Sequence, residues 1–182
     1  MTDLGAVTTS RLELRPVHES DVDSLATVFA KPEVWHFPYG RGLDRDETEA
    51  FVRAQLGQWA TVGFGLWVAR LRDGGAVVGV IGLSVPTFVP EILPAVEVGW
   101  RLDPAHWGHG LATEGARAAL REGFEVLGLA EICSLPQSAN PASWRVCERL
   151  GMRFVREVVC PPTERRFAVN ARMYVMERDS HL

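Results

Sequence analysis

The sequence predicts a mixed α/β sandwich, in which a mostly antiparallel sheet of about seven strands is flanked by about four helices. Three observations predict this class. Residues 11–17 alternate polar and apolar with a period of two, which is typical of a half-buried strand. Residues 64–71 and 77–85 are apolar and are joined by Asp73-Gly74-Gly75, a hairpin signal. Residues 110–127 have helical periodicity and lie between strand-like segments, which indicates a crossover connection.

Two helices are expected in the first third of the chain. Apolar residues at helical spacing begin after Glu19 or Ser20, and Pro32 ends the pattern because proline cannot continue a helix. Asp44, followed three residues later by Glu47, is typical of a capping box at the start of the second helix. The aromatic segment 35–40 between them fits neither period, so we expect a loop there.

The second half alternates strands with helices. Strand patterns occupy residues 95–102, 130–135, 154–159 and 168–177. Asn140 before Pro141 predicts the start of a last helix, because asparagine is a good N-cap and proline is tolerated at the first helical position. Leu150-Gly151 predicts its end.

Composition and charge argue against several classes of function. The chain has 182 residues, and we expect a single domain over residues 1–182. Its formal net charge of −4 argues against nucleic-acid binding. No apolar stretch is long enough to span a bilayer and residues 1–10 lack a secretory pattern, so we expect no membrane association. Three cysteines without CxxC spacing indicate reduced thiols in the cytoplasm and argue against a metal site.

A strand, a short turn and a helix meet around two glycines, Gly108 and Gly110. The first N–H groups of a helix lack intrahelical partners and carry partial positive charge, and glycine lets a ligand approach the backbone. This arrangement favours a phosphate or pyrophosphate site. A Walker loop is absent because no Gly-Lys-Ser/Thr follows, and Thr113 occupies the third glycine position of a dinucleotide fingerprint. A turn that only packs is the alternative.

Five segments in order resemble the GNAT superfamily of N-acetyltransferases, and most closely its RimJ/RimL-like branch, which acetylates ribosomal-protein N-termini and other amines. The segments are residues 9–16, 96–100, 107–114, 140–143 and 150–152. The similarity extends over about residues 9–177. The superfamily pyrophosphate motif, Arg/Gln-x-x-Gly-x-Gly/Ala, aligns with Trp107-x-x-Gly110-x-Ala112, where Trp107 departs from the pattern as is usual in this branch.

The resemblance implies a GNAT-like fold with a central strand–turn–helix CoA site, acetyl-CoA as the acetyl donor, and no metal. Backbone amides of residues 109–113 would hold the pyrophosphate, and the backbone of residues 100–102 would pair with the pantetheine arm. The residues implied to bind the donor are Trp100, Arg101, Leu102, Trp107, Gly108, His109, Gly110, Leu111, Ala112, Thr113, Asn140 and Ser143. Gly99 either marks a bulge that separates this strand from the strand at 130–135 or is an ordinary strand glycine.

The resemblance also implies two catalytic residues. Glu97 would accept the proton of the attacking amine, directly or through water; alternatively it binds a cationic substrate or faces solvent. Ser143 would stabilise or protonate the departing CoA thiolate in place of the tyrosine that many members use; alternatively it is a small first-turn helix residue. Asn140 would hydrogen-bond the pantetheine amide, cap the helix, or do both.

The amine acceptor is expected in a cleft between three loops, at residues 35–40, 84–94 and 161–169. Its aromatic residues, Trp35, Phe37, Tyr39 and Phe88, suggest a partly apolar pocket with a cation–π contact to the substrate; alternatively they cover the core or a dimer contact. The function implied is acetyl transfer to a primary amine, either a protein N-terminus or a small molecule. A CoA-binding sensor or scaffold without turnover is the alternative, and a homodimer is left open.

Overall fold

The computed structural model describes residues 4–164 and 167–180. Its strands are β1 (Val7–Thr8), β2 (Leu12–Pro16), β3 (Leu66–Leu71), β4 (Val77–Ser84), β5 (Glu97–Leu102), β6 (Glu131–Ser134), β7 (Arg153–Cys160) and β8 (Val169–Glu177). Its α-helices are α1 (Val22–Phe29), α2 (His36–Tyr39), α3 (Arg45–Val62), α4 (Leu111–Glu125) and α5 (Pro141–Leu150). Short 3₁₀ turns are η1 (Glu19–Asp21), η2 (Pro90–Ile92), η3 (Pro104–His106) and η4 (Arg178–Ser180). Over these ranges, no helix is both long and apolar enough to cross a bilayer.

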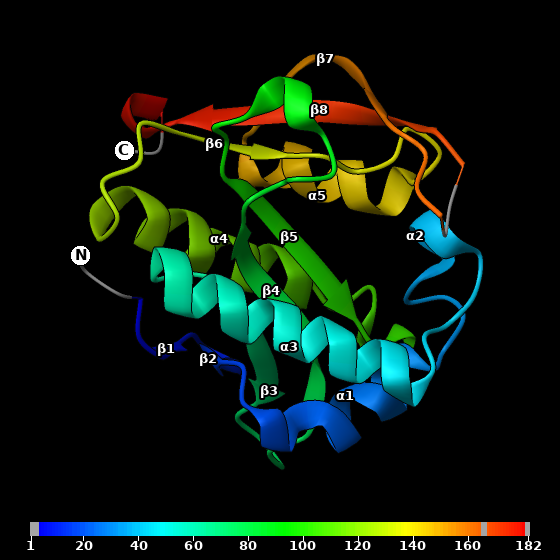
Figure 1. The fold of residues 1–182 in the computed structure, drawn as a ribbon. Helices are drawn as coiled ribbons and strands as arrows, with labels where there is room; N and C mark the ends of the chain where they lie inside the picture. The colour runs from blue at the N-terminus through cyan, green and yellow to red at the C-terminus, as the bar shows by residue number, and fades with distance from the viewer. Residues whose placement is uncertain (1–3, 165–166, 181–182) are drawn as a thin grey trace.

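The strands form one sheet in the order β1-β2-β3-β4-β5-β6-β8-β7 (Figure 1). Hydrogen-bonded neighbours are antiparallel except β5 and β6, which are parallel and are connected by α4. This confirms the expected mixed α/β class with antiparallel meanders and a strand–helix–strand crossover. The described sheet has eight strands instead of about seven. The extra strand, β1, has two residues and is too short to carry a periodic signal.

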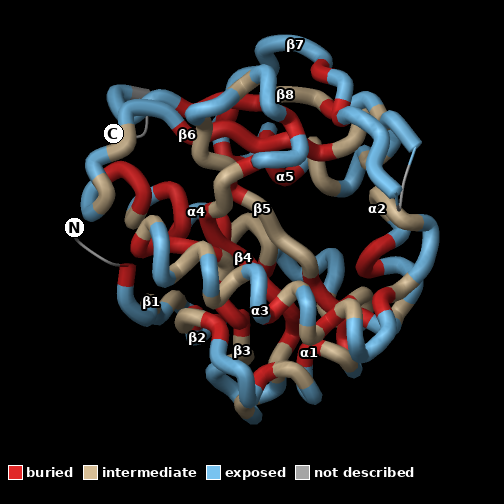
Figure 2. The backbone as a smooth tube through the Cα atoms, in the orientation of Figure 1, coloured by how far each residue is buried: buried red, intermediate tan, exposed pale blue. Residues whose placement is uncertain are grey.

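The sheet separates two layers of helices. On β4, Val80 packs in the cluster that includes α1 and α3, whereas the next residue, Ile81, packs in the cluster that includes α4. Successive side chains of a strand point to opposite faces, so β4 is buried on both sides, which accounts for its continuous apolar run. Figure 2 shows this burial concentrated along the central strands and the inner sides of the helices.

The capping signals in the sequence are confirmed at α3. Asp44 Oδ1 accepts from the Glu47 N–H at 2.8 Å, and the Glu47 carboxylate accepts from the Asp44 N–H at 3.0 Å. The loop expected at residues 35–40 is wrong in part, because one helical turn, α2, forms there. The N–H of Tyr39 and that of Gly40 donate to carbonyls four residues earlier, and Gly40 ends the turn at a φ of +69°. A single turn is too short for a period to show.

The sheet opens between β5 and β6. The two strands pair only at Glu97 and Cys133, and β5 then continues along β4 while β6 ends at Ser134. Of the two alternatives for Gly99, the ordinary strand glycine is correct and the bulge is wrong, because Gly99 pairs with Gly82 in unbroken register along β4. The separation expected to accompany that bulge is present. β6 has four residues and pairs with β5 at Cys133 alone, whereas β5 keeps a continuous register with β4.

Candidate active site

A cavity of about 720 Å³ lies where β5 and β6 separate. It brings together side chains from β5, α5, α2 and the β4–β5 connection. Of the residues predicted from the sequence, those lining this cavity are Glu97, Trp100, Arg101, Asn140, Ser143, Trp35, Phe37, Tyr39 and Phe88. The three loops expected around the acceptor all contribute lining residues. The fold therefore gathers both predicted catalytic residues and all four predicted acceptor residues at one site.

Glu97 is the first residue of β5 and lies in the wall of the cavity. Burial raises the pKa of this carboxyl group to about 7, since the charged form loses hydration. The Leu135 backbone N–H, the Arg101 guanidinium and the Ser84 hydroxyl stabilise the ionised form and limit the rise. A carboxyl group with a pKa near neutrality can both accept and release a proton at physiological pH, which suits a general base.

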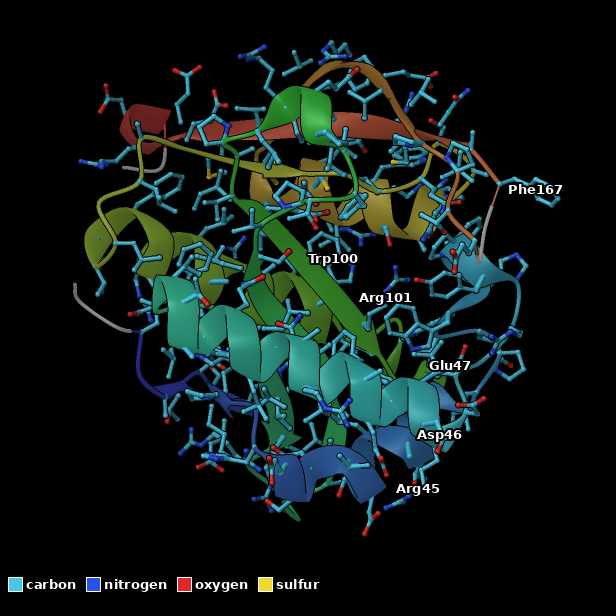
Figure 3. All side chains as sticks on the ribbon, viewed as in Figure 1. Arg45, Asp46, Glu47, Trp100, Arg101 and Phe167 are labelled. Atoms are coloured by element: carbon cyan, nitrogen blue, oxygen red, sulfur yellow. The ribbon has the colours of Figure 1, made fainter. Side chains whose placement is uncertain are left out.

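Arg101 extends from β5 toward α2 (Figure 3). Its guanidinium donates to the Phe37 carbonyl at 2.5 Å and to the Val34 carbonyl at 3.3 Å, and lies 4.5 Å from the centre of the Trp35 ring. Burial lowers the pKa of Arg101, and the Glu97 carboxylate opposes that change. The arginine thus holds the segment that carries Trp35 and Phe37, a role for its side chain that sequence reasoning missed.

Asn140 and Ser143 meet at the first turn of α5. The Asn140 Oδ1 accepts from the Ser143 backbone N–H at 3.2 Å, and its Nδ2 donates to the Ser143 Oγ at 3.1 Å. Because the backbone N–H can only donate, it fixes which end of the amide is oxygen. The serine oxygen accepts from the amide, so its own hydrogen is directed elsewhere. The predicted N-cap at Asn140 is confirmed.

The turn before α4 has the backbone that its glycines predict. Gly108 and Gly110 adopt φ angles of +77° and +78°, and Gly110 is the N-cap of α4, so no side chain caps the first N–H groups. Gly110 and Thr113 line a shallower pocket of about 450 Å³. Its other lining residues are Ser10, Arg11, Glu114, Arg117 and Arg149, which give it a positive balance.

The remaining predicted donor-binding residues line neither cavity. These are Leu102, Trp107, Gly108, His109, Leu111 and Ala112. Leu102 and Leu111 are buried in the core, and the Trp107 indole N–H donates to the Leu102 carbonyl at 2.8 Å. This bond occupies one acceptor of the strand end that was expected to pair with the pantetheine arm. Leu102 and Leu111 could therefore contribute through their backbone groups only.

The turn is clamped to the start of the sheet by Glu114, in the first turn of α4. Its Oε1 accepts from the Thr9 hydroxyl at 2.6 Å and from the Arg11 N–H at 2.8 Å, and its Oε2 accepts from the Arg11 Nε at 2.7 Å. Arg11 also donates to the His109 carbonyl at 2.7 Å. Burial opposes ionisation of Glu114, but these hydrogen bonds outweigh it and lower its pKa. Sequence reasoning missed this clamp, since its partners lie about a hundred residues apart.

The sequence that forms this site is similar to known proteins. The family described as acetyltransferase (GNAT) domain matches residues 11–153. The protein YkkB of Bacillus subtilis is 32% identical over 152 residues, covering 82% of this chain and 86% of YkkB. The FsC-acetyl coenzyme A-N(2)-transacetylase of Aspergillus fumigatus is 35% identical over 153 residues, covering 81% of this chain and 64% of that relative.

A solved structure has the same fold. RimL, a ribosomal L7/L12 alpha-N-protein acetyltransferase in complex with coenzyme A, superposes with a TM-score of 0.76 over 96% of this chain and 99% of RimL. The two sequences are 16% identical, so this likeness shows the fold alone. In the described part of this chain, no group of three or more His, Cys, Asp or Glu side chains is arranged to hold a metal ion.

Proposed function

Because the chain belongs to the acetyltransferase (GNAT) domain family, we propose that it transfers the acetyl group of acetyl-CoA to a primary amine. We propose that residues 1–182 act as one catalytic domain in the cytoplasm. We assign the chain to the RimJ/RimL-like branch on the order of its motifs. The observation that carries the proposal is that Glu97, Asn140 and Ser143 line one cavity, at the point where β5 and β6 separate.

Two features support a fit to acetyl-CoA. The uncapped N-terminus of α4, with positive φ at Gly108 and Gly110, offers backbone N–H groups to a pyrophosphate without an obstructing Cβ. Trp100 and Arg101 line the cavity that also holds Glu97, and on the side of β5 that faces β6 their backbone pairs with no described strand, which leaves peptide groups for the pantetheine arm. Acetyl-CoA supplies a thioester carbonyl that an amine can attack.

Glu97 acts as the general base in this proposal. As the amine nitrogen bonds to the thioester carbonyl carbon, the carboxylate takes a proton from that nitrogen, directly or through one water. The raised pKa of Glu97 supports the role, because the group then binds the proton well enough to draw it from a reacting amine. When the carbon–sulfur bond breaks, the products are the acetylated amine and CoA.

Ser143 donates a hydrogen bond from its hydroxyl to the departing sulfur and keeps its proton; the thiolate takes its proton from solvent, and Glu97 returns the proton it accepted to solvent. The Asn140 amide supports this role, because it donates to the serine oxygen and leaves the hydroxyl hydrogen for another acceptor. The oxygen of the Asn140 amide accepts from the Ser143 N–H, so Asn140 both orients the serine and caps α5. Asn140 is accordingly a positioning residue for the serine.

The proposal is tested by measuring release of free CoA thiol from acetyl-CoA across a panel of amines, with the acetylated product identified by mass spectrometry. Thermal unfolding with acetyl-CoA, ATP and NADH provides a second measurement that does not depend on the acceptor. We expect acetyl-CoA to raise Tm and the other two nucleotides to have little effect. An equal shift with ATP, or thiol release that no amine accelerates, would contradict the proposal.

A further inference from the structure

Aromatic side chains form part of the lining of the cavity that holds Glu97. We call this set the aromatic wall; its members are Trp35, Phe37, Tyr39, Phe51, Phe88 and Trp100. Trp35 stacks with Tyr39, with ring centres 5.7 Å apart, and meets Phe51 edge to face. Rings held by one another in this way form a preorganised apolar surface, which an acceptor with an apolar body would match.

Charge is scarce in the same cavity. Among the described residues that line it, Glu97 is the only acidic residue and Arg101 the only basic one. Arg101 is committed to the carbonyls of Val34 and Phe37 and to the Trp35 ring. Its positive charge therefore stays in the wall, where it repels ammonium groups.

Carboxylates on the surrounding loops do not supply a second anionic site in the cavity. Glu91, in the connection between β4 and β5, pairs with Arg156 of β7 at 3.0 Å and does not line the cavity. Glu97 is thus the single carboxylate available to an ammonium group in the described site. A second ammonium group inside this cavity would find no carboxylate among the described lining residues, which include the cationic Arg101, and burial of an unpaired charge is costly.

We infer that the acceptor is a monoamine on an apolar, chiefly aromatic or aliphatic body, and that diamines, polyamines and aminoglycosides are poor acceptors. This inference rests on the proposed function and specifies its substrate class. The overall charge of −4 suggests a cationic acceptor, but the lining of the cavity limits that preference to one cationic group. A small arylalkylamine and a protein N-terminus that begins with an apolar residue share this chemistry.

The test compares hexylamine with cadaverine, which have equal length and differ by a terminal methyl group in place of the second ammonium group. We expect kcat/KM to favour hexylamine by at least about 30-fold, the lower range for a buried unpaired charge. Tryptamine represents a small arylalkylamine, and a short peptide beginning with phenylalanine represents a protein N-terminus. The kcat/KM values for these two compounds distinguish the two sources of the acceptor. Equal or better turnover of cadaverine or spermidine would overturn the inference.

A charge variant tests whether the scarcity of carboxylates causes the preference. Phe88 lines the cavity and is 41% exposed, so a polar side chain there should leave the fold intact. Phe88→Glu is expected to reduce the hexylamine-to-cadaverine ratio about fivefold, the upper range for pairing at an exposed position. Glutamine has nearly the same shape as glutamate but no charge, so Phe88→Gln is expected to leave the ratio within about twofold of the wild-type value. Equal ratios in the two variants would contradict this cause.

Binding separates failure of the inference from failure of the proposed function. Trp35 and Trp100 line the cavity, so intrinsic fluorescence can report amine binding in the absence of turnover. If no amine is acetylated yet hexylamine quenches the fluorescence at lower concentration than cadaverine, the selectivity holds and the proposed activity fails. If amines are acetylated but cadaverine binds as well as hexylamine, the activity holds and the selectivity fails.

Discussion

Replacing Glu97 with glutamine should make the protein more stable at alkaline pH. The carboxyl group has a pKa of about 7 in the folded protein, against an ordinary value of 4.5. Below pH 4.5 the group is neutral in both the folded and the unfolded state, so it does not lower the free energy of unfolding. As pH rises from 4.5 toward 7, the group ionises more readily in the unfolded state, and the free energy of unfolding falls. The difference corresponds to about 3 kcal/mol at full ionisation. Glutamine carries no charge and avoids this cost.

Urea unfolding of the wild type and Glu97→Gln at pH 5 and pH 8 measures this difference. At pH 8 we expect the variant to exceed the wild type by up to about 3 kcal/mol, and at pH 5 by under about 1 kcal/mol. Glu125→Gln, at the exposed C-terminal end of α4, removes the same charge far from the cavity and should show no such pH dependence. A stability difference that is the same at both pH values would refute the argument that burial raises the pKa.

The same substitution should lower activity even though it stabilises the fold. For the wild type, kcat/KM is expected to rise with pH through an apparent pKa near 7, and this inflection should be absent in Glu97→Gln. The loss in rate should be on the order of 100-fold, in line with general-base catalysis. A higher KM for the amine with unchanged kcat would show that Glu97 only binds the ammonium group.

Three further substitutions test the donor side of the site. Gly110→Val should abolish the rise in Tm caused by acetyl-CoA, because φ is +78° there and a branched Cβ would face the bound pyrophosphate; Gly74→Val, at a φ of +75° in the hairpin, should retain that rise. Ser143→Ala should lower kcat more than it raises KM for acetyl-CoA, and the reverse pattern in steady-state kinetics would make Ser143 a binding residue. Glu114→Gln should raise KM for acetyl-CoA several-fold while KM for the amine stays unchanged, since the carboxylate holds the turn before α4 through Arg11; equal changes in both constants would indicate general unfolding.

Elements governed by neighbouring residues could be predicted from the sequence. The capping box at Asp44, the N-cap at Asn140 and the glycine turn before α4 all depend on groups within a few positions along the chain. The period of apolar residues likewise predicted most strands and helices, because one-sided burial imposes it on each element. The two-residue β1 and the single turn of α2 were missed because they are shorter than one detectable period.

The electrostatics and anchoring of the site were decided only by the tertiary structure. The sequence places Glu97 on a strand, but its raised pKa depends on desolvation by residues from other elements. Arg101 reaches the carbonyl of Phe37, and Glu114 reaches Thr9 and Arg11, across 64 to 105 positions of sequence. No local pattern encodes such pairs, because hydrogen bonds and burial depend on distance in space, and that distance is set by how the sheet brings remote strands together.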